Sequence, residues 1–167
     1  GAVEVLLLER EATGTWRALV RPGRRVRPGT TVIAGDLTVE EDRERLVEAA
    51  LGVNGAVDVL VNNAGHSDPT PAESESLEHF QHTMGINVVA PFHLCQRVAR
   101  PMLARGRGSI VNVASILGLV AASPMKDASY CSSKGALVNL TRQLGCEWGR
   151  KGVRVNALAP GWFPSEM

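Results

Sequence analysis

A tyrosine and a lysine four residues apart, Tyr130 and Lys134, are the residues of this sequence best suited to act together in chemistry. A spacing of four on a helix places both side chains on one face. A free phenol ionises near pH ~10, and a neighbouring ammonium ion favours the phenolate and lowers that value. The pair could therefore serve as an acid/base near neutral pH, although an ordinary amphipathic helix surface can show the same spacing.

Other polar and small residues lie where predicted strands or helices end. Asn62-Asn63-Ala64-Gly65 follows one apolar run, Ser115 follows another, and Pro160-Gly161 follows the last. Asn87 lies within a long helical segment. This context, rather than the spacing of Tyr130 and Lys134 alone, distinguishes a reactive pair from a helix surface.

The elements that must position these residues alternate between strands and helices. Short runs rich in Val, Leu and Ile predict strands over residues 3–8, 31–34, 57–61, 109–113 and 153–158. Their nearly continuous hydrophobicity is typical of a parallel sheet buried on both faces. Helix-length segments cover residues 39–51, 77–104 and 128–149. The alternation predicts an α/β fold.

Three local signals refine these elements. Thr38 and Glu41 have the form of a capping box at the start of the first helix. Pro91 lies inside the long middle segment and predicts a kink or a junction of two helices, because proline removes one helical hydrogen bond. Residues 13–30 contain several Gly, Pro and Arg residues, so we expect a loop there.

Composition narrows the class of protein. The 167 residues, 44% hydrophobic and 21% charged, predict one globular domain over residues 1–167. A net charge of +1 argues against attraction to nucleic acid or an anionic membrane. Three cysteines form neither an even disulfide set nor a close-spaced metal cluster, so no metal site is expected. No apolar run approaches the ~20 residues of a membrane span and no leader pattern opens the chain, so we expect a soluble, cytoplasmic protein.

These motifs occur in the order of a known family. The elements N-N-A-G, Ser115, Y-x-x-x-K and P-G make residues 32–167 resemble the short-chain dehydrogenase/reductase family in its common short form. The resemblance implies a Rossmann-like, doubly wound parallel sheet in a three-layer α/β/α arrangement. It also implies hydride transfer between NAD or NADP and a secondary alcohol or ketone, and assembly as a homodimer or homotetramer.

The resemblance assigns roles to four catalytic positions. Tyr130 is the general acid in reduction and the base in oxidation, and Ser115 donates a hydrogen bond to the substrate oxygen. Lys134 depresses the pKa of Tyr130 and binds hydroxyls of the nicotinamide ribose. Asn87 holds a water that links Lys134 to solvent, while the alternative is a polar residue at a helix kink.

Further positions are implied to bind the cofactor. Asn63, Ala64 and Gly65 line the cofactor beside the adenine ribose. The Asp36 carboxylate accepts a hydrogen bond from the adenine amino group. The loop that begins at Pro160 contacts the nicotinamide carboxamide. An acidic residue at the end of the first strand favours NAD over NADP, because it would repel a 2′-phosphate. With Tyr130 and Lys134, the cofactor positions are Glu9, Asp36, Leu37, Asn63, Ala64, Gly65, Pro160, Gly161 and Ser165. Substrate-side positions fall at residues 66–71 and 117–127 and at Trp162.

The sequence departs from the family in one respect that keeps a second hypothesis open. The Gly-rich T-G-x-x-x-G-x-G turn that binds pyrophosphate is absent. We expect that turn before Gly1 and the last family strand after Met167, with further chain missing around residues 12–15. The alternative is a catalytically silent fragment derived from this family, or a scaffolding subunit, that lacks the phosphate-binding loop. A third hypothesis, that the arginine-rich loop binds nucleic acid, is disfavoured because the loop carries no recognised binding motif.

Overall fold

The computed structural model describes residues 4–10, 16–21, 33–121 and 123–162. The chain divides into two compact units, residues 1–33 and residues 34–167. Within the described part of the chain, no helix is both long enough and apolar enough to cross a bilayer. The prediction of one domain over the whole chain remains a prediction.

The first unit contains two antiparallel strands, β1 (Glu4–Arg10) and β2 (Trp16–Arg21). Val5 lies opposite Val20, and the register shifts between Leu7 and Glu9. Two predictions are corrected here. The first strand pairs with β2 rather than within the parallel sheet, and residues 16–21 are a strand rather than part of a loop. Residues 13–30 are rich in Arg, Gly and Pro, which led to the prediction of a loop. The segment also contains the short apolar run of β2, whose backbone groups form hydrogen bonds with β1.

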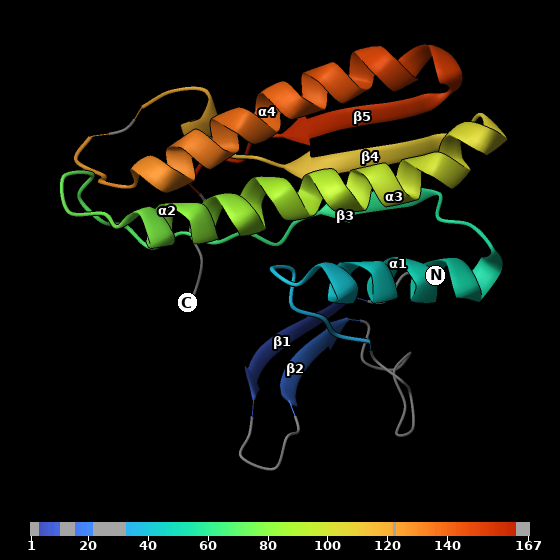
Figure 1. The fold of residues 1–167 in the computed structure, drawn as a ribbon, viewed down its shortest axis with the longest axis horizontal. Coiled ribbons are helices and arrows are strands. Elements are labelled where there is room, and N and C mark those ends of the chain that lie inside the picture. The colour runs from blue at the N-terminus through green and yellow to red at the C-terminus, as the bar shows by residue number, and fades with distance from the viewer. Residues whose placement is uncertain (1–3, 11–15, 22–32, 122, 163–167) are drawn as a thin grey trace. The chain divides into compact units, whose positions relative to one another are not determined.

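The second unit is built on a parallel sheet in the order β3 (Val59–Asn62), β4 (Gly108–Val113) and β5 (Val153–Leu158). Leu60 lies opposite Ile110, which lies opposite Val155. Helices run between these strands, and Figure 1 shows α3 (Ala90–Arg105) and α4 (Ala128–Trp148) alongside the sheet. The structure confirms the predicted α/β class, with a parallel sheet flanked by helices.

The core of this unit lies between the sheet and its helices. Buried side chains from α1 (Glu40–Asn54), α3, α4 and the strands form one cluster. Its members are Val47, Cys95, Val98, Met102, Ile110, Leu144, Val153 and Val155. On β3, Val59 and Val61 are 57% and 54% exposed, so the helices cover only one side of this strand. The packing fixes the sheet against α3 and α4, the elements that carry the candidate site.

The start of α1 differs from the predicted capping box. Val39 is the N-cap residue and makes no side-chain cap bond. The Thr38 hydroxyl instead donates to Asp36 Oδ1 at 2.7 Å, and the Thr38 N–H donates to the same oxygen at 2.8 Å. The helix therefore begins one residue later than the capping box requires, Thr38 Oγ accepts no cap bond, and this prediction is wrong. Residues 33 and 34 are likewise not part of a strand, while 31 and 32 lie outside the described residues.

The long middle helix is interrupted, as Pro91 predicts. It consists of α2 (Leu77–Met84), a π-helical turn η2 (Gly85–Val89) and α3. Pro91 lies in the first turn of α3, where a missing N–H costs little. A π turn inserts an extra residue into a helix and is common at functional sites. Here the turn contains Asn87, whose side chain is fully buried.

Candidate active site

The loops after β4 and β5 lie together at the carboxyl ends of these parallel strands. The Ala114 N–H donates to the Leu158 carbonyl at 2.7 Å, and the Ile116 N–H donates to the Pro160 carbonyl at 3.0 Å. Between them, Ser115 caps the short 3-10 helix η3 (Ile116–Gly118). Its Oγ accepts from the Leu117 N–H at 3.1 Å, which leaves the Ser115 hydroxyl hydrogen free to donate elsewhere.

Helix α4 brings Tyr130 and Lys134 to the same place. The Lys134 ammonium lies 5.5 Å from the centre of the Tyr130 ring, as one turn of helix requires. Lys134 is only 3% exposed, and its Nζ donates to the Val113 carbonyl at 2.8 Å. Burial lowers the pKa of Lys134, because the charged form loses solvation. One bond to carbonyl leaves two ammonium hydrogens for a ligand.

Asn87 holds the loop after β3 against these residues. Its Oδ1 accepts from the His66 N–H at 2.8 Å, and its Nδ2 donates to the His66 carbonyl at 2.8 Å and to Ser133 Oγ at 2.9 Å. Ser133 in turn donates to the Tyr130 carbonyl at 2.7 Å. The amide is thus a clamp between loop and helix α4. The predicted water relay through Asn87 remains a prediction.

Gly65 lies close to the side-chain ammonium group of Lys134. A Cβ at this position would lie 3.3 Å from Lys134 Nζ and 3.4 Å from Asn87 Oδ1. The family resemblance implies that the segment containing Gly65 lines the adenine ribose of a cofactor. In the structure, Gly65 also gives space to the ammonium group, so a larger residue would press on it.

Two adjoining cavities meet at these side chains. The larger, about 330 Å³, is lined by residues that include Asn63, Gly65 and Lys134. The smaller, about 230 Å³, is lined on its far side by Ile116, Leu117, Met125 and Trp162. Residues that line both are Ser67, Ser115, Tyr130, Pro160 and Gly161. The site therefore has one wall common to two compartments, and that wall contains Tyr130 and Ser115.

Several of the residues predicted to bind the adenine half of the cofactor do not line these two cavities together with Tyr130 and Ser115. Asp36 is exposed, and the pKa of its carboxyl is lowered by hydrogen bonds from the Thr38 hydroxyl and N–H. The Leu37 carbonyl accepts from Arg43 Nη1 at 2.6 Å. Ala64 is exposed, and neither cavity is lined by these three residues. Glu9 lies in β1 of the other unit, and Ser165 lies outside the described residues.

Two residues acquire a role that the sequence did not assign. Ser67 and Asp127 fell within the predicted substrate-side ranges, and in the structure Ser67 Oγ donates to Asp127 Oδ2 at 2.6 Å. Asp127 is also the N-cap of α4, because its Oδ1 accepts from the Tyr130 N–H at 3.2 Å. An aspartate just before a helical segment is a recognised N-cap signal. That signal could have identified Asp127 in advance, whereas nothing local predicted its pairing with Ser67.

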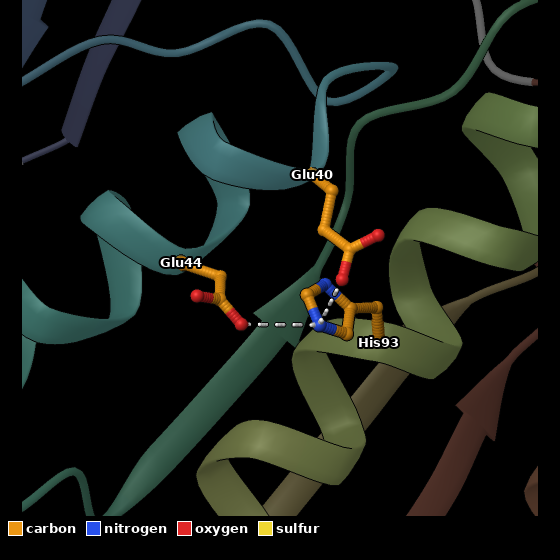
Figure 2. A group of neighbouring side chains, drawn as sticks. All are labelled: Glu40, Glu44 and His93. Atoms are coloured by element: carbon orange, nitrogen blue, oxygen red, sulfur yellow. Dashed lines mark ion pairs between the residues drawn. The ribbon is translucent and has the colours of Figure 1, made fainter.

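One cluster outside this site has the composition of a metal centre. Figure 2 shows the side chains of Glu40, Glu44 and His93 next to one another. Their potential ligand atoms all lie within 4.8 Å of one another. Arg43 Nε donates to His93 Nδ1 at 3.1 Å, so a neutral imidazole carries its hydrogen on Nε2. That nitrogen lies 3.9 Å from each carboxylate. The arrangement is suited to an electrostatic contact between α1 and α3 and presents no imidazole lone pair to a metal.

Comparison with known proteins defines the class. The profile described as short chain dehydrogenase matches residues 2–167, and the chain belongs to this family of NAD(P)-dependent oxidoreductases. A galactitol 2-dehydrogenase (L-tagatose-forming) from Cereibacter sphaeroides is 38% identical over 165 residues, which cover 98% of this chain and 63% of the relative. An NAD-dependent glycerol dehydrogenase from Listeria innocua is 34% identical over 167 residues, which cover 100% of this chain and 63% of the relative.

A solved structure agrees in fold. A gluconate 5-dehydrogenase from Burkholderia cenocepacia, in complex with NADP and tartrate, is 34% identical with a TM-score of 0.72, over 78% of this chain and 51% of that chain. The chain therefore spans between half and two thirds of the length of these proteins. Their names include both NAD and NADP, so the family relationship alone does not select one cofactor.

Proposed function

We propose that the protein is an NAD(P)-dependent oxidoreductase that interconverts a secondary alcohol and a ketone, with Tyr130 as the general acid/base. The observation that supports this function is the wall between the two cavities, where Tyr130 and Ser115 are common to both compartments and Lys134 lines the larger one. A group that exchanges a proton with the substrate must lie within hydrogen-bond reach of it. The cofactor, when bound, supplies the hydride acceptor or donor.

The side chains divide the remaining work. In oxidation, the substrate hydroxyl gives its proton to the Tyr130 oxygen, and the carbon that carries this hydroxyl gives up a hydride to the cofactor. In reduction, the proton and the hydride return to the substrate. The Ser115 hydroxyl orients the substrate oxygen, since the Leu117 N–H already occupies one acceptor site of Ser115 Oγ. The two free ammonium hydrogens of Lys134 fit a pair of ribose hydroxyls in the larger cavity. Buried and bonded to Val113, this lysine is held in place before a ligand arrives.

The choice of cofactor follows a separate argument. By the family resemblance, Glu9 corresponds to an acidic residue beside the adenosine ribose, and such a carboxylate would accept from a free 2′-hydroxyl and repel a 2′-phosphate. We therefore favour NAD over NADP. Parallel titrations with NADH and NADPH would test this preference. Tighter binding of NADPH would contradict the role given to Glu9. The cytoplasmic location expected from the sequence remains a prediction, as does the assembly as a homodimer or homotetramer that the family resemblance implies.

Tyr130→Phe is the direct test of the reaction. Tyr130 is the only tyrosine of the sequence, so the substitution removes the single phenol of the chain. We expect turnover to fall by about 10²–10⁴-fold, with NADH binding retained in a nicotinamide fluorescence titration. Ser132→Ala, an exposed position on the same helix, is the control. Full activity of the Tyr130→Phe protein would refute the assignment, and failure of the unsubstituted protein to bind either cofactor would favour the scaffolding alternative.

A further inference from the structure

Ser67 is the polar residue of the shared wall to which the proposed mechanism gives no task. It lies in the loop after β3 and lines both cavities together with Tyr130 and Ser115. The loop is not free to move independently, because the neighbouring His66 backbone is held by two hydrogen bonds to Asn87. The Ser67 hydroxyl is therefore presented from a fixed position beside the reacting groups.

The direction of its hydrogen bond determines what Ser67 can offer a ligand. Ser67 Oγ donates to Asp127 Oδ2 at 2.6 Å, the short distance of a bond to a carboxylate. Asp127 is 5% exposed, and its other oxygen accepts from the Tyr130 N–H at 3.2 Å and from Ser129 Oγ at 3.5 Å. Since the only hydroxyl hydrogen of Ser67 is committed to Asp127, only oxygen lone pairs remain for the cavity.

The rest of the smaller cavity sets the charge of a suitable ligand. Apart from Ser67, Ser115 and Tyr130, its described side chains are Ile116, Leu117, Met125, Pro160 and Trp162, with Gly161 completing the wall. No charged side chain is among these described lining residues. A carboxylate group placed beside Ser67 would meet oxygen lone pairs and the negative charge of Asp127 behind them. A hydroxyl group would donate its hydrogen to Ser67 without that penalty.

We infer that Ser67, backed by Asp127, is a specificity-determining residue that accepts a hydrogen bond from a second hydroxyl of the substrate. The inference rests on the proposed function and narrows it to uncharged vicinal diols and polyols, or to hydroxyketones in the reverse direction. In oxidation, one hydroxyl carbon loses hydride to the cofactor and its proton to Tyr130. The adjacent hydroxyl does not react and donates a hydrogen bond to Ser67 Oγ.

Three substrates of the form CH₃–CH(OH)–X test directly whether a second hydroxyl binds to Ser67. Propane-1,2-diol carries CH₂OH at X, butan-2-ol carries the nearly isosteric ethyl group, and lactate carries a carboxylate. We expect kcat/KM to be about tenfold or more higher for the diol than for either other substrate, since a site built to bind a hydroxyl rejects analogues that lack it. In Ser67→Ala the ratio of diol to butan-2-ol should fall towards one. A residue that merely anchors the loop would lower both rates by the same factor.

Asp127→Asn provides a second variant that keeps a good helix N-cap. The amide can donate to Ser67 Oγ, which frees the serine hydrogen to point into the cavity. Discrimination between propane-1,2-diol and lactate should therefore decrease relative to the unsubstituted protein. Ser132→Ala should preserve all three ratios. Equal kcat/KM for diol and butan-2-ol in the unsubstituted protein, or an unchanged ratio in Ser67→Ala, would overturn the inference.

A binding measurement separates this inference from the proposed reaction. Trp162 lines the smaller cavity, so its fluorescence can report ligands in protein that carries Tyr130→Phe and does not turn over. We expect propane-1,2-diol to bind about tenfold more tightly than butan-2-ol, and Ser67→Ala to remove the difference. This preference without turnover in the unsubstituted protein would defeat the proposed reaction and leave the Ser67 site supported. Equal binding of the two alcohols would defeat the Ser67 site itself.

Discussion

Replacing Asn87 by alanine tests whether the clamp between the loop after β3 and helix α4 stabilises the protein. Asn87 is fully buried in the π turn, and its amide makes three hydrogen bonds, two to the His66 backbone and one to Ser133. Alanine removes all three and leaves the partner groups without an evident replacement. Because the bonds join two segments that carry the candidate site, both stability and catalysis should suffer.

The size of the effect follows from the number of bonds. A buried hydrogen bond contributes about 1 kcal/mol net, and an abandoned buried partner costs about 1–3 kcal/mol. Three bonds at the lower figure give about 3 kcal/mol, and the cavity left by the amide adds to this. A typical domain has about 5–15 kcal/mol of stability, so the variant should still fold but with a substantial loss.

Urea denaturation of the cofactor-free protein measures this loss. Asn139→Ala is the matched control, because Asn139 is exposed on α4 and alanine has the higher helix propensity. We expect the control to be neutral or slightly stabilised and Asn87→Ala to lose about 3 kcal/mol or more. A loss below about 1 kcal/mol would show that water or backbone movement replaces these bonds and would refute the reasoning.

Three further predictions concern other residues of the second unit. Gly65→Ala should lower kcat/KM by about tenfold through displacement of the Lys134 ammonium, whereas Gly52→Ala, with no atom within 4 Å of the new Cβ, should not; equal activities would contradict the contact at Gly65. Burial raises the pKa of the Cys95 thiol to about 11, so iodoacetamide at neutral pH should modify exposed Cys146 and spare Cys95 in the native protein, as judged by peptide mass. Burial lowers the pKa of Lys134 from 10.5, so the folded state binds fewer protons than the unfolded chain between the two values, and the stability of cofactor-free protein should rise with pH across that window. In urea denaturation Lys134→Met should remove this contribution, and an unchanged pH slope would refute it.

Much of the second unit could be predicted because its signals are local. The run at residues 153–158 is apolar enough to indicate a strand, and β5 covers the same residues. Pro91 indicated the interruption of the middle helix because proline has no N–H to donate, although Pro101 lies inside α3 without ending it. By contrast, the capping-box pattern placed the start of the first helix at Thr38, whereas Val39 is the N-cap residue in the structure. Local patterns locate a helix end only to within one or two residues.

By itself, the sequence determined the α/β alternation and the spacing that sets Tyr130 and Lys134 on one helical face, because hydrophobic runs and helical periodicity depend only on neighbouring residues. The tertiary structure decided which distant groups meet. Ser67 and Asp127 are 60 residues apart, and Asn87 is 21 residues from His66. Such contacts depend on how β3, the π turn and α4 pack together. The Tyr130 and Lys134 pair was therefore foreseeable, while the acceptor at Ser67 that points to a diol substrate required the folded chain.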